Sequence, residues 1–181
     1  MFDTAVYSIQ AMIVDLAKLE GPHNSFEFSI AADDLDLETE NVRLKGDTAV
    51  SGEISKNNSK AEVAGTISVA AELDCTRCLT PTEQTLSFDF EAVYVPSQEL
   101  LKESEAELEA DDLDVDALDG DELDLREVVR EQILLNLPDQ IFCKDDCKGL
   151  CQKCGANLNL IDCSCKETET DPRWAALKNL K

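Results

Sequence analysis

The fold of this chain is decided by residues 62–95, which read EVAGTISVAAELDCTRCLTPTEQTLSFDFEAVYV. Apolar and polar side chains alternate along both halves of the stretch, as in strands that have one buried and one exposed face. The predicted buried positions are Val63, Ile67, Val69, Ala71, Leu73 and Cys75, then Leu86, Phe88, Phe90, Ala92 and Tyr94. This pattern predicts a long antiparallel hairpin with Cys75 and Cys78 at its tip.

Shorter alternating runs precede the hairpin, around Phe26–Ile30 and Val42–Leu44, with a weaker one over residues 47–54. The polar run 55–60 predicts a loop between strands. Residues 1–24 fit either a short helix or an extended segment, and the Gly21-Pro22 pair should end it. The chain therefore predicts an α+β protein whose core, residues 25–95, is a mostly antiparallel β-sheet or partial barrel.

The segment that follows is strongly acidic. Residues 99–124 hold thirteen acids and one base, Lys102, and such dense like charge favours a solvated linker over 97–121. Calcium binding is the alternative interpretation. An EF-hand alignment, however, would put Val115 and Ala117 at positions that need carboxylates.

Helical patterns appear on the C-terminal side of the linker. Residues 122–138 predict a helix that packs on the sheet, with a capping box at Asp124 and a stop at Pro138. Its core face would carry Leu125, Val128, Val129 and Ile133. Its apolar last turn, Leu134, Leu135 and Leu137, indicates either burial or a partner surface, and burial is the favoured expectation. A second, short helix should begin at Asp171-Pro172 and dock through Trp174.

Six of the eight cysteines fall between Cys143 and Cys165. No apolar run approaches a membrane span and the N-terminus lacks signal-peptide character, so we expect a cytoplasmic protein with no membrane partner. Stable disulfides are rare in that reducing compartment, whereas closely spaced cysteines commonly bind metal. The segment is therefore predicted to be a zinc clip.

The spacing nominates individual ligands. Cys151-Gln152-Lys153-Cys154-Gly155 is typical of a zinc knuckle, in which the glycine lets backbone amides turn toward the thiolates. Either Cys163 with Cys165 or Cys143 with Cys147 could complete the tetrahedron, and the sequence does not choose between them. The six cysteines of the segment exceed one four-ligand site. Either two of them are not ligands, or the hairpin pair Cys75 and Cys78 joins two of them in a second site. The sequence therefore predicts one or two zinc ions.

Other chemistries are less consistent with the sequence. The cysteine spacing matches neither ferredoxin pattern of an iron–sulfur cluster. Cys75 and Cys78 could form a dithiol redox couple, with Arg77 favouring the thiolate, but such couples usually sit at a helix N-terminus in a βαβ unit. The single histidine, His23, is predicted to be a surface residue. No nucleophile motif or phosphate-binding loop is present, so we expect no enzymatic activity and no small-molecule substrate.

The distribution of charge along the chain indicates which kinds of macromolecule it could bind. The formal net charge of −23 argues against a protein that coats nucleic acid and favours basic protein partners. Residues 1–142 hold nine Lys and Arg against thirty-three acids, whereas residues 143–181 hold seven against six. The nearly neutral cysteine-rich end is thus the part most tolerant of RNA phosphate.

These features predict four regions: a β-rich core that includes the Cys75/Cys78 hairpin (1–96), an acidic linker (97–121), a helix packed on the core (122–138), and a zinc clip with a C-terminal helix (139–181).

Four segments, in this order, resemble the bacterial YceD family of large ribosomal RNA subunit accumulation proteins. They are LDCTRCL at 73–79, the helix from Asp124 to Pro138, CKGLCQKCGANLN at 147–159, and DPRWAAL at 171–177. The resemblance implies a cytoplasmic, non-enzymatic ribosome assembly factor that supports accumulation of large-subunit ribosomal RNA. We therefore expect the acidic body to bind a basic ribosomal protein and the cysteine-rich end to contact the RNA. A dithiol redox protein and a structural zinc adaptor of another assembly are the alternatives.

Overall fold

The computed structural model describes residues 12–19, 21, 23–57, 60–98, 115–165 and 173. The chain divides into two compact units, Met1–Leu73 with Thr82–Asp139 and Asp74–Pro81 with Gln140–Lys181. The tip of the central hairpin thus groups with the cysteine-rich segment, although the sequence placed it in a 1–96 core. The predicted helix at Trp174 lies outside the described residues.

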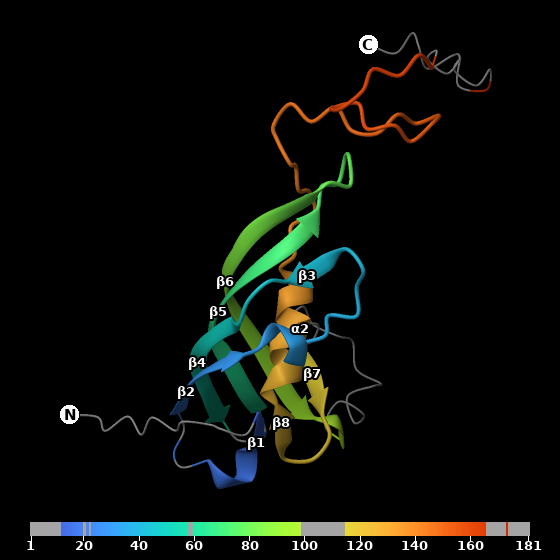
Figure 1. The fold of residues 1–181 in the computed structure, drawn as a ribbon. Helices are drawn as coiled ribbons and strands as arrows, with labels where there is room; N and C mark the ends of the chain where they lie inside the picture. The colour runs from blue at the N-terminus through green and yellow to red at the C-terminus, as the bar shows by residue number, and fades with distance from the viewer. Residues whose placement is uncertain are drawn as a thin grey trace. The chain divides into compact units, whose positions relative to one another are not determined.

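A six-stranded sheet forms most of the first unit (Figure 1). Its strands are β2 (His23–Ile30), β3 (Val42–Leu44), β4 (Thr48–Asn57), β5 (Lys60–Asp74), β6 (Pro81–Pro96) and β7 (Val115–Leu118). Their order is β2-β4-β5-β6-β7, and β3 pairs with β5 further along that strand. The β2–β4 and β4–β5 pairs are antiparallel, whereas β7 runs parallel to β6. The mostly antiparallel sheet is therefore confirmed, with one parallel pair, and the described strands do not close into a barrel.

The alternation in the central hairpin decides which face of the sheet is buried. Val63 and Ile67 of β5 are fully buried, and Phe90 of β6 is nearly so. They join one hydrophobic core with Ile30 of β2 and Ile133 of the helix α2 (Leu125–Leu135), which lies against this sheet face in Figure 1. The period-two pattern of the sequence therefore identifies the core face correctly.

The helix begins directly after the predicted cap, Asp124, which is three residues later than the start of the predicted range 122–138, and it ends at Leu135, before Pro138. The Asp124 carboxylate accepts a hydrogen bond from the Arg126 amide at 2.9 Å, and the predicted apolar face is buried. The expected burial of the whole last turn is wrong, since Leu135 is 76% exposed. Two residues beyond Ile133 the helix has turned by about 200°, which points Leu135 away from the core.

Short strands appear where the sequence predicted linker or helix. β7 lies within the predicted acidic linker, and β8 (Glu122–Asp124) occupies the predicted first turn of the helix. β8 pairs with β1 (Ile13–Asp15), and the 3₁₀ turn η1 (Leu16–Lys18) follows β1. The buried side chain of Leu123 anchors β8 in the core. A second 3₁₀ turn, η2 (Ala32–Asp34), follows β2.

The polar run 55–60 is also mostly strand rather than loop, because Ser55–Asn57 continue β4 and pair with β5.

Two glycines face each other across β4 and β5 and leave room for an aromatic ring. Gly52 and Gly65 are register partners, and a Cβ on Gly52 would lie 2.8 Å from Cζ of Phe26 and still closer to the Ala64 carbonyl oxygen. Gly52→Ala is expected to lower the free energy of unfolding by about 2 kcal/mol, because a backbone carbonyl cannot move aside as a side chain can. Urea unfolding followed by circular dichroism measures the loss.

Gly46→Ala is the matched control, since a Cβ there meets no atom within 4 Å. Equal stability of the two variants would contradict the close packing of β4 on β5 at Gly52.

Candidate metal centres

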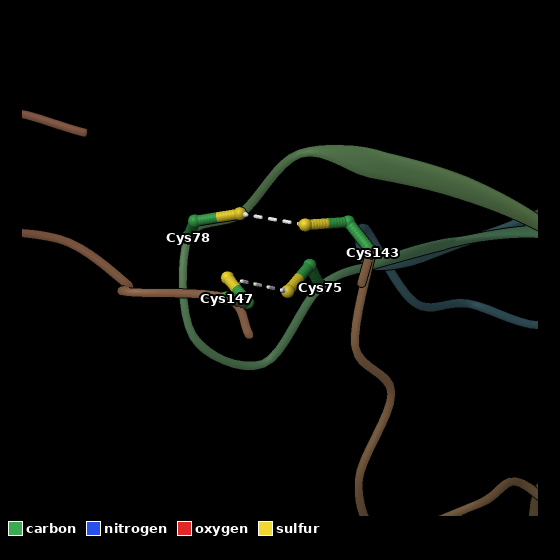
Figure 2. A group of neighbouring side chains, drawn as sticks. All are labelled: Cys75, Cys78, Cys143 and Cys147. Atoms are coloured by element: carbon green, nitrogen blue, oxygen red, sulfur yellow. Dashed lines mark hydrogen bonds between the residues drawn. The ribbon is translucent and has the colours of Figure 1, made fainter. Parts of the chain in front are cut away.

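The first group of four thiols joins the hairpin tip to the segment that follows α2. The sulfur atoms of Cys75, Cys78, Cys143 and Cys147 all lie within 4.8 Å of one another and point toward a common centre (Figure 2). The Sγ–Sγ distance is 3.5 Å between Cys78 and Cys143 and 3.8 Å between Cys75 and Cys147. Cys75, Cys78 and Cys147 are buried, so this group, the first centre, is largely closed to water.

A tight turn at the hairpin tip positions the first two thiols. The Leu79 amide donates to the Cys75 carbonyl at 2.9 Å, and the Cys75 amide donates to the Thr80 carbonyl at 2.9 Å. Leu79 adopts φ +58°, a left-handed conformation that is unusual for a branched side chain. Both cysteines of the Cys-x-x-Cys stretch consequently point to the same side.

The second group contains Cys151, Cys154, Cys163 and Cys165, whose sulfur atoms also lie within 4.8 Å of one another. Its turn repeats the bonds of the first: the Gly155 amide donates to the Cys151 carbonyl and the Cys151 amide to the Ala156 carbonyl, both at 2.8 Å. Gly155 has φ +70°, the role that Leu79 takes at the hairpin tip. The knuckle turn predicted for residues 151–155 is therefore present. Cys154 and Cys165 are exposed, so this second centre is more open than the first.

This arrangement answers a question that the spacing left open. Cys163 and Cys165 join the 151–155 knuckle, whereas Cys143 and Cys147 join Cys75 and Cys78. All eight cysteines thus fall into two groups of four, each able to hold a metal ion. His23, the single histidine of the sequence, is exposed in β2 and belongs to neither group.

Backbone amides favour one thiolate in each group. Burial alone would raise the pKa of Cys75, yet the amides of Cys143, Arg77 and Cys78 outweigh it and lower that pKa to about 6. In the second centre the amides of Cys154 and Lys153 lower the pKa of Cys151 to about 6.

Neighbouring sulfurs have the opposite effect on other members. The hydrogen bond to Cys78, followed by burial, raises the pKa of Cys143 to about 12, and that to Cys154 raises the pKa of Cys165 to about 12. Each group therefore contains a thiol that ionises readily, Cys75 or Cys151, and another whose ionisation is opposed by neighbouring sulfurs, chiefly Cys78 in the first group and Cys154 in the second. A divalent cation would remove that opposition, so the donor set and its electrostatics fit a metal ion.

Polar contacts hold the 140–147 segment against the hairpin tip. The Thr76 amide and hydroxyl both donate to the Ile141 carbonyl, at 2.8 and 3.1 Å. Arg77 donates from its guanidinium to the Cys147 carbonyl at 3.1 Å, and the guanidinium carbon lies 4.0 Å from the Phe142 ring centroid. The sequence singled out Arg77 for its charge beside the two thiols; in the structure its guanidinium bonds the backbone of the segment that carries Cys143 and Cys147. Sequence reasoning missed this contact because it joins residues 70 positions apart.

The left-handed residue of the hairpin turn suggests a simple substitution. Leu79→Gly is expected to raise the free energy of unfolding by about 1 kcal/mol, because glycine adopts positive φ without strain and the Leu79 side chain is 61% exposed. Thermal unfolding measures the change. Gly155→Leu is the reciprocal control and should lower the stability. If Leu79→Gly lowers the stability instead of raising it, the leucine side chain has a packing role that outweighs the backbone strain.

None of the helices in the described ranges is long and apolar enough to cross a membrane.

Comparison with known proteins places these features in a family. A family model described as large ribosomal RNA subunit accumulation protein YceD matches residues 63–181. Protein YlbN of Bacillus subtilis is 29% identical over 162 residues, covering 88% of this chain and 90% of YlbN. A protein of Mycobacterium tuberculosis is 28% identical over 115 residues, which cover 64% of this chain and 53% of that one.

The large ribosomal RNA subunit accumulation protein YCED homolog 1, chloroplastic, of Arabidopsis thaliana is 37% identical over 59 residues, 33% of this chain. The aligned part is 18% of the Arabidopsis protein, so the chain corresponds to only a portion of some relatives. No solved structure matches the chain. The matched range 63–181 covers about two thirds of the chain and contains all eight cysteines of the two centres, and on this evidence the chain belongs to the YceD family.

Proposed function

We propose that this protein is a non-enzymatic ribosome assembly factor that supports accumulation of large-subunit ribosomal RNA, and that its two thiol groups each hold one zinc ion. The family match over residues 63–181 carries the ribosomal part of the proposal. It is supported by a relative whose name describes large ribosomal RNA subunit accumulation.

The choice of zinc follows from the donor set. Four thiolates in a compact group suit a tetrahedral ion of borderline softness, and a centre with four protein ligands has no open position for substrate or activated water. Both centres are therefore structural in this proposal. An iron–sulfur cluster also takes four cysteines, and elemental analysis of the purified protein separates the two, with two zinc ions per chain expected.

The proposed structural role of both metals is the reason to assign no enzymatic activity. A redox role for Cys75 and Cys78 is the main alternative, and the lowered pKa of Cys75 supports it. The Cys75 sulfur also lies 3.8 Å from the sulfur of Cys147, within a group of four thiols. A redox couple needs only two thiols, whereas a zinc ion uses all four, and a lowered pKa suits a metal ligand as well as a redox thiol.

The acidic composition suggests how the factor recognises its partner. With a net charge of −23, the chain attracts basic protein surfaces, and a basic ribosomal protein of the large subunit fits this requirement. Direct contact with large-subunit RNA is assigned to the nearly neutral residues 143–181. The cytoplasm is the expected site of action.

Gene depletion tests the ribosomal role directly. Cells without the protein should show a lowered ratio of large-subunit to small-subunit ribosomal RNA, and the wild-type chain should restore it. An unchanged ratio would contradict the ribosomal assignment, leaving the metal centres to serve another assembly.

Affinity capture tests the electrostatic recruitment. The tagged protein should recover a basic large-subunit protein at low salt and lose it as ionic strength rises, because screening weakens contacts between exposed charges. Recovery that is unchanged at high salt would argue for an apolar interface instead.

A further inference from the structure

The two centres are separated in sequence by only three residues, Lys148, Gly149 and Leu150, here called the spacer. Backbone hydrogen bonds connect the spacer to the hairpin tip of the first centre and to the loop of the second centre. The Leu150 amide donates to the Arg77 carbonyl of the hairpin tip at 3.0 Å, whereas the Gly149 carbonyl accepts from the Leu158 amide of the second centre's loop at 2.9 Å. Gly149 has φ +74°, and a Cβ there would lie 3.0 Å from the Arg77 carbonyl oxygen, so the spacer is fitted closely to the tip.

Asn159 makes the most direct connection between the centres. It lies in the loop between Cys154 and Cys163, two ligands of the second centre. Its side-chain amide nevertheless donates to the sulfur of Cys147, a ligand of the first centre, with an Nδ2–Sγ distance of 3.4 Å. In the sequence, the residue is marked only by a local pattern, the Asn-x-Asn stretch of Asn157 and Asn159 that follows the second knuckle.

The orientation of the Asn159 amide is fixed by its other bonds. Oδ1 accepts from the Lys148 amide at 2.9 Å, and Nδ2 also donates to Oδ1 of Asn157 at 2.9 Å. A flipped amide would put an oxygen against the Asn157 oxygen and an NH₂ group against the Lys148 N–H. Both N–H donors and the acceptor are used only in this orientation, which directs one N–H at Cys147.

The Asn159 donor matters because Cys147 is only 5% exposed, so water has little access to its sulfur and cannot readily replace the Asn159 N–H as a hydrogen-bond donor. An N–H bond to a metal-bound sulfur stabilises its negative charge, and such outer contacts influence metal affinity strongly. The Asn159 loop is held at both ends by ligands of the second centre. An ion bound there would hold the loop in place, and the loop would in turn present its donor to the first centre.

We propose that Asn159 is a positioning residue that couples the two centres, so that a metal ion bound at either one raises the affinity of the other. Linkage makes the effect reciprocal. The inference rests on the proposed metal binding and adds to it that the ions bind cooperatively.

Cadmium titration of the reduced, metal-free chain of 181 residues tests the coupling, with thiolate–cadmium absorbance as the signal. Cys154→Ser with Cys165→Ser removes the second centre and is expected to lower the cadmium affinity of the first by about tenfold. In an Asn159→Asp background, the same pair of substitutions should change that affinity by less than about twofold. The aspartate keeps the acceptor for Lys148 and lacks the donor for Cys147.

Gln152→Glu is the control for added charge, because it places one carboxylate at an exposed position of the second knuckle. It should leave the tenfold coupling in place. If Gln152→Glu abolishes the coupling as Asn159→Asp does, charge rather than the N–H bond is responsible and the role of Asn159 is overturned.

Native mass spectrometry of half-loaded chains compares the wild type with Asn159→Asp. Coupling predicts a smaller fraction of one-ion chains in the wild type than in the variant at the same loading, because uncoupled centres populate the one-ion species more. Equal one-ion fractions in the two chains would overturn the coupling and leave the two metal centres intact. Failure of the wild-type chain to bind cadmium would instead overturn the metal proposal itself.

Discussion

Replacing Cys75 and Cys78 together by serine is expected to reduce the zinc content from two ions per chain to one. Serine hydroxyls do not replace thiolates as zinc ligands at neutral pH, and Cys143 and Cys147 alone leave the coordination sphere half empty. Metal analysis of the purified variant gives the stoichiometry. This substitution has the largest expected effect, because binding of a structural zinc ion is worth about 10 kcal/mol or more.

The loss should be visible locally as well. Hydrogen exchange at the amides of Thr76 and Leu150 should accelerate, since their acceptors are the carbonyls of Ile141 and Arg77, across the first centre. Cys154→Ser with Cys165→Ser is the matched control, and it should also leave one ion while the Thr76 amide stays protected. A redox couple makes a different prediction: the wild-type chain would hold one zinc ion, at the second centre, and the Cys75/Cys78 variant would lose function with that zinc content unchanged.

Ile133→Ala is expected to lower the free energy of unfolding of the first unit by about 3 kcal/mol. The side chain is fully buried and belongs to the core that α2 shares with the inner face of the sheet. Its truncation removes apolar contacts and leaves a cavity that the strands cannot fill without bending. Urea unfolding monitored by the far-ultraviolet circular dichroism of the sheet and helix measures the difference.

Leu135→Ala, two residues along the same helix, provides the control. Leu135 is 76% exposed, so its truncation should change stability by less than about 0.5 kcal/mol. If both variants lose the same stability, the helix face would be assigned wrongly and α2 would bury its last turn, as the sequence alone suggested.

The parts of the fold that the sequence predicts are those with repeated local signals. β5 and β6 each carry at least five alternating positions, and the apolar spacing of α2 together with Asp124 marks both its face and its start. β1 and β8 have three residues each and β7 has four, too few to establish a period. Their pairing depends on distant partners, such as Leu123 opposite Val14.

The same division between local and distant information applies to the metal centres. The Cys151–Gly155 knuckle is a local pattern and could be recognised from spacing alone. The assignment of Cys143 and Cys147 to the hairpin tip could not, because Cys143 lies 65 positions from Cys78. The contacts of Arg77 and Asn159 were missed for a related reason, since each acts on the backbone or sulfur of a residue that only the folded chain brings near.

The separation between the ligands of the first centre has a consequence for synthesis of the chain. The hairpin tip leaves the ribosome with two of the four thiols, and the other two follow only after β6, β7, β8 and α2 have been translated. At about 5–20 residues per second, the 65 residues from Cys78 to Cys143 take roughly 3–13 seconds. During that interval the nascent chain presents only two of the four thiols, so an ion bound by all four could be captured only after Cys147 has been translated.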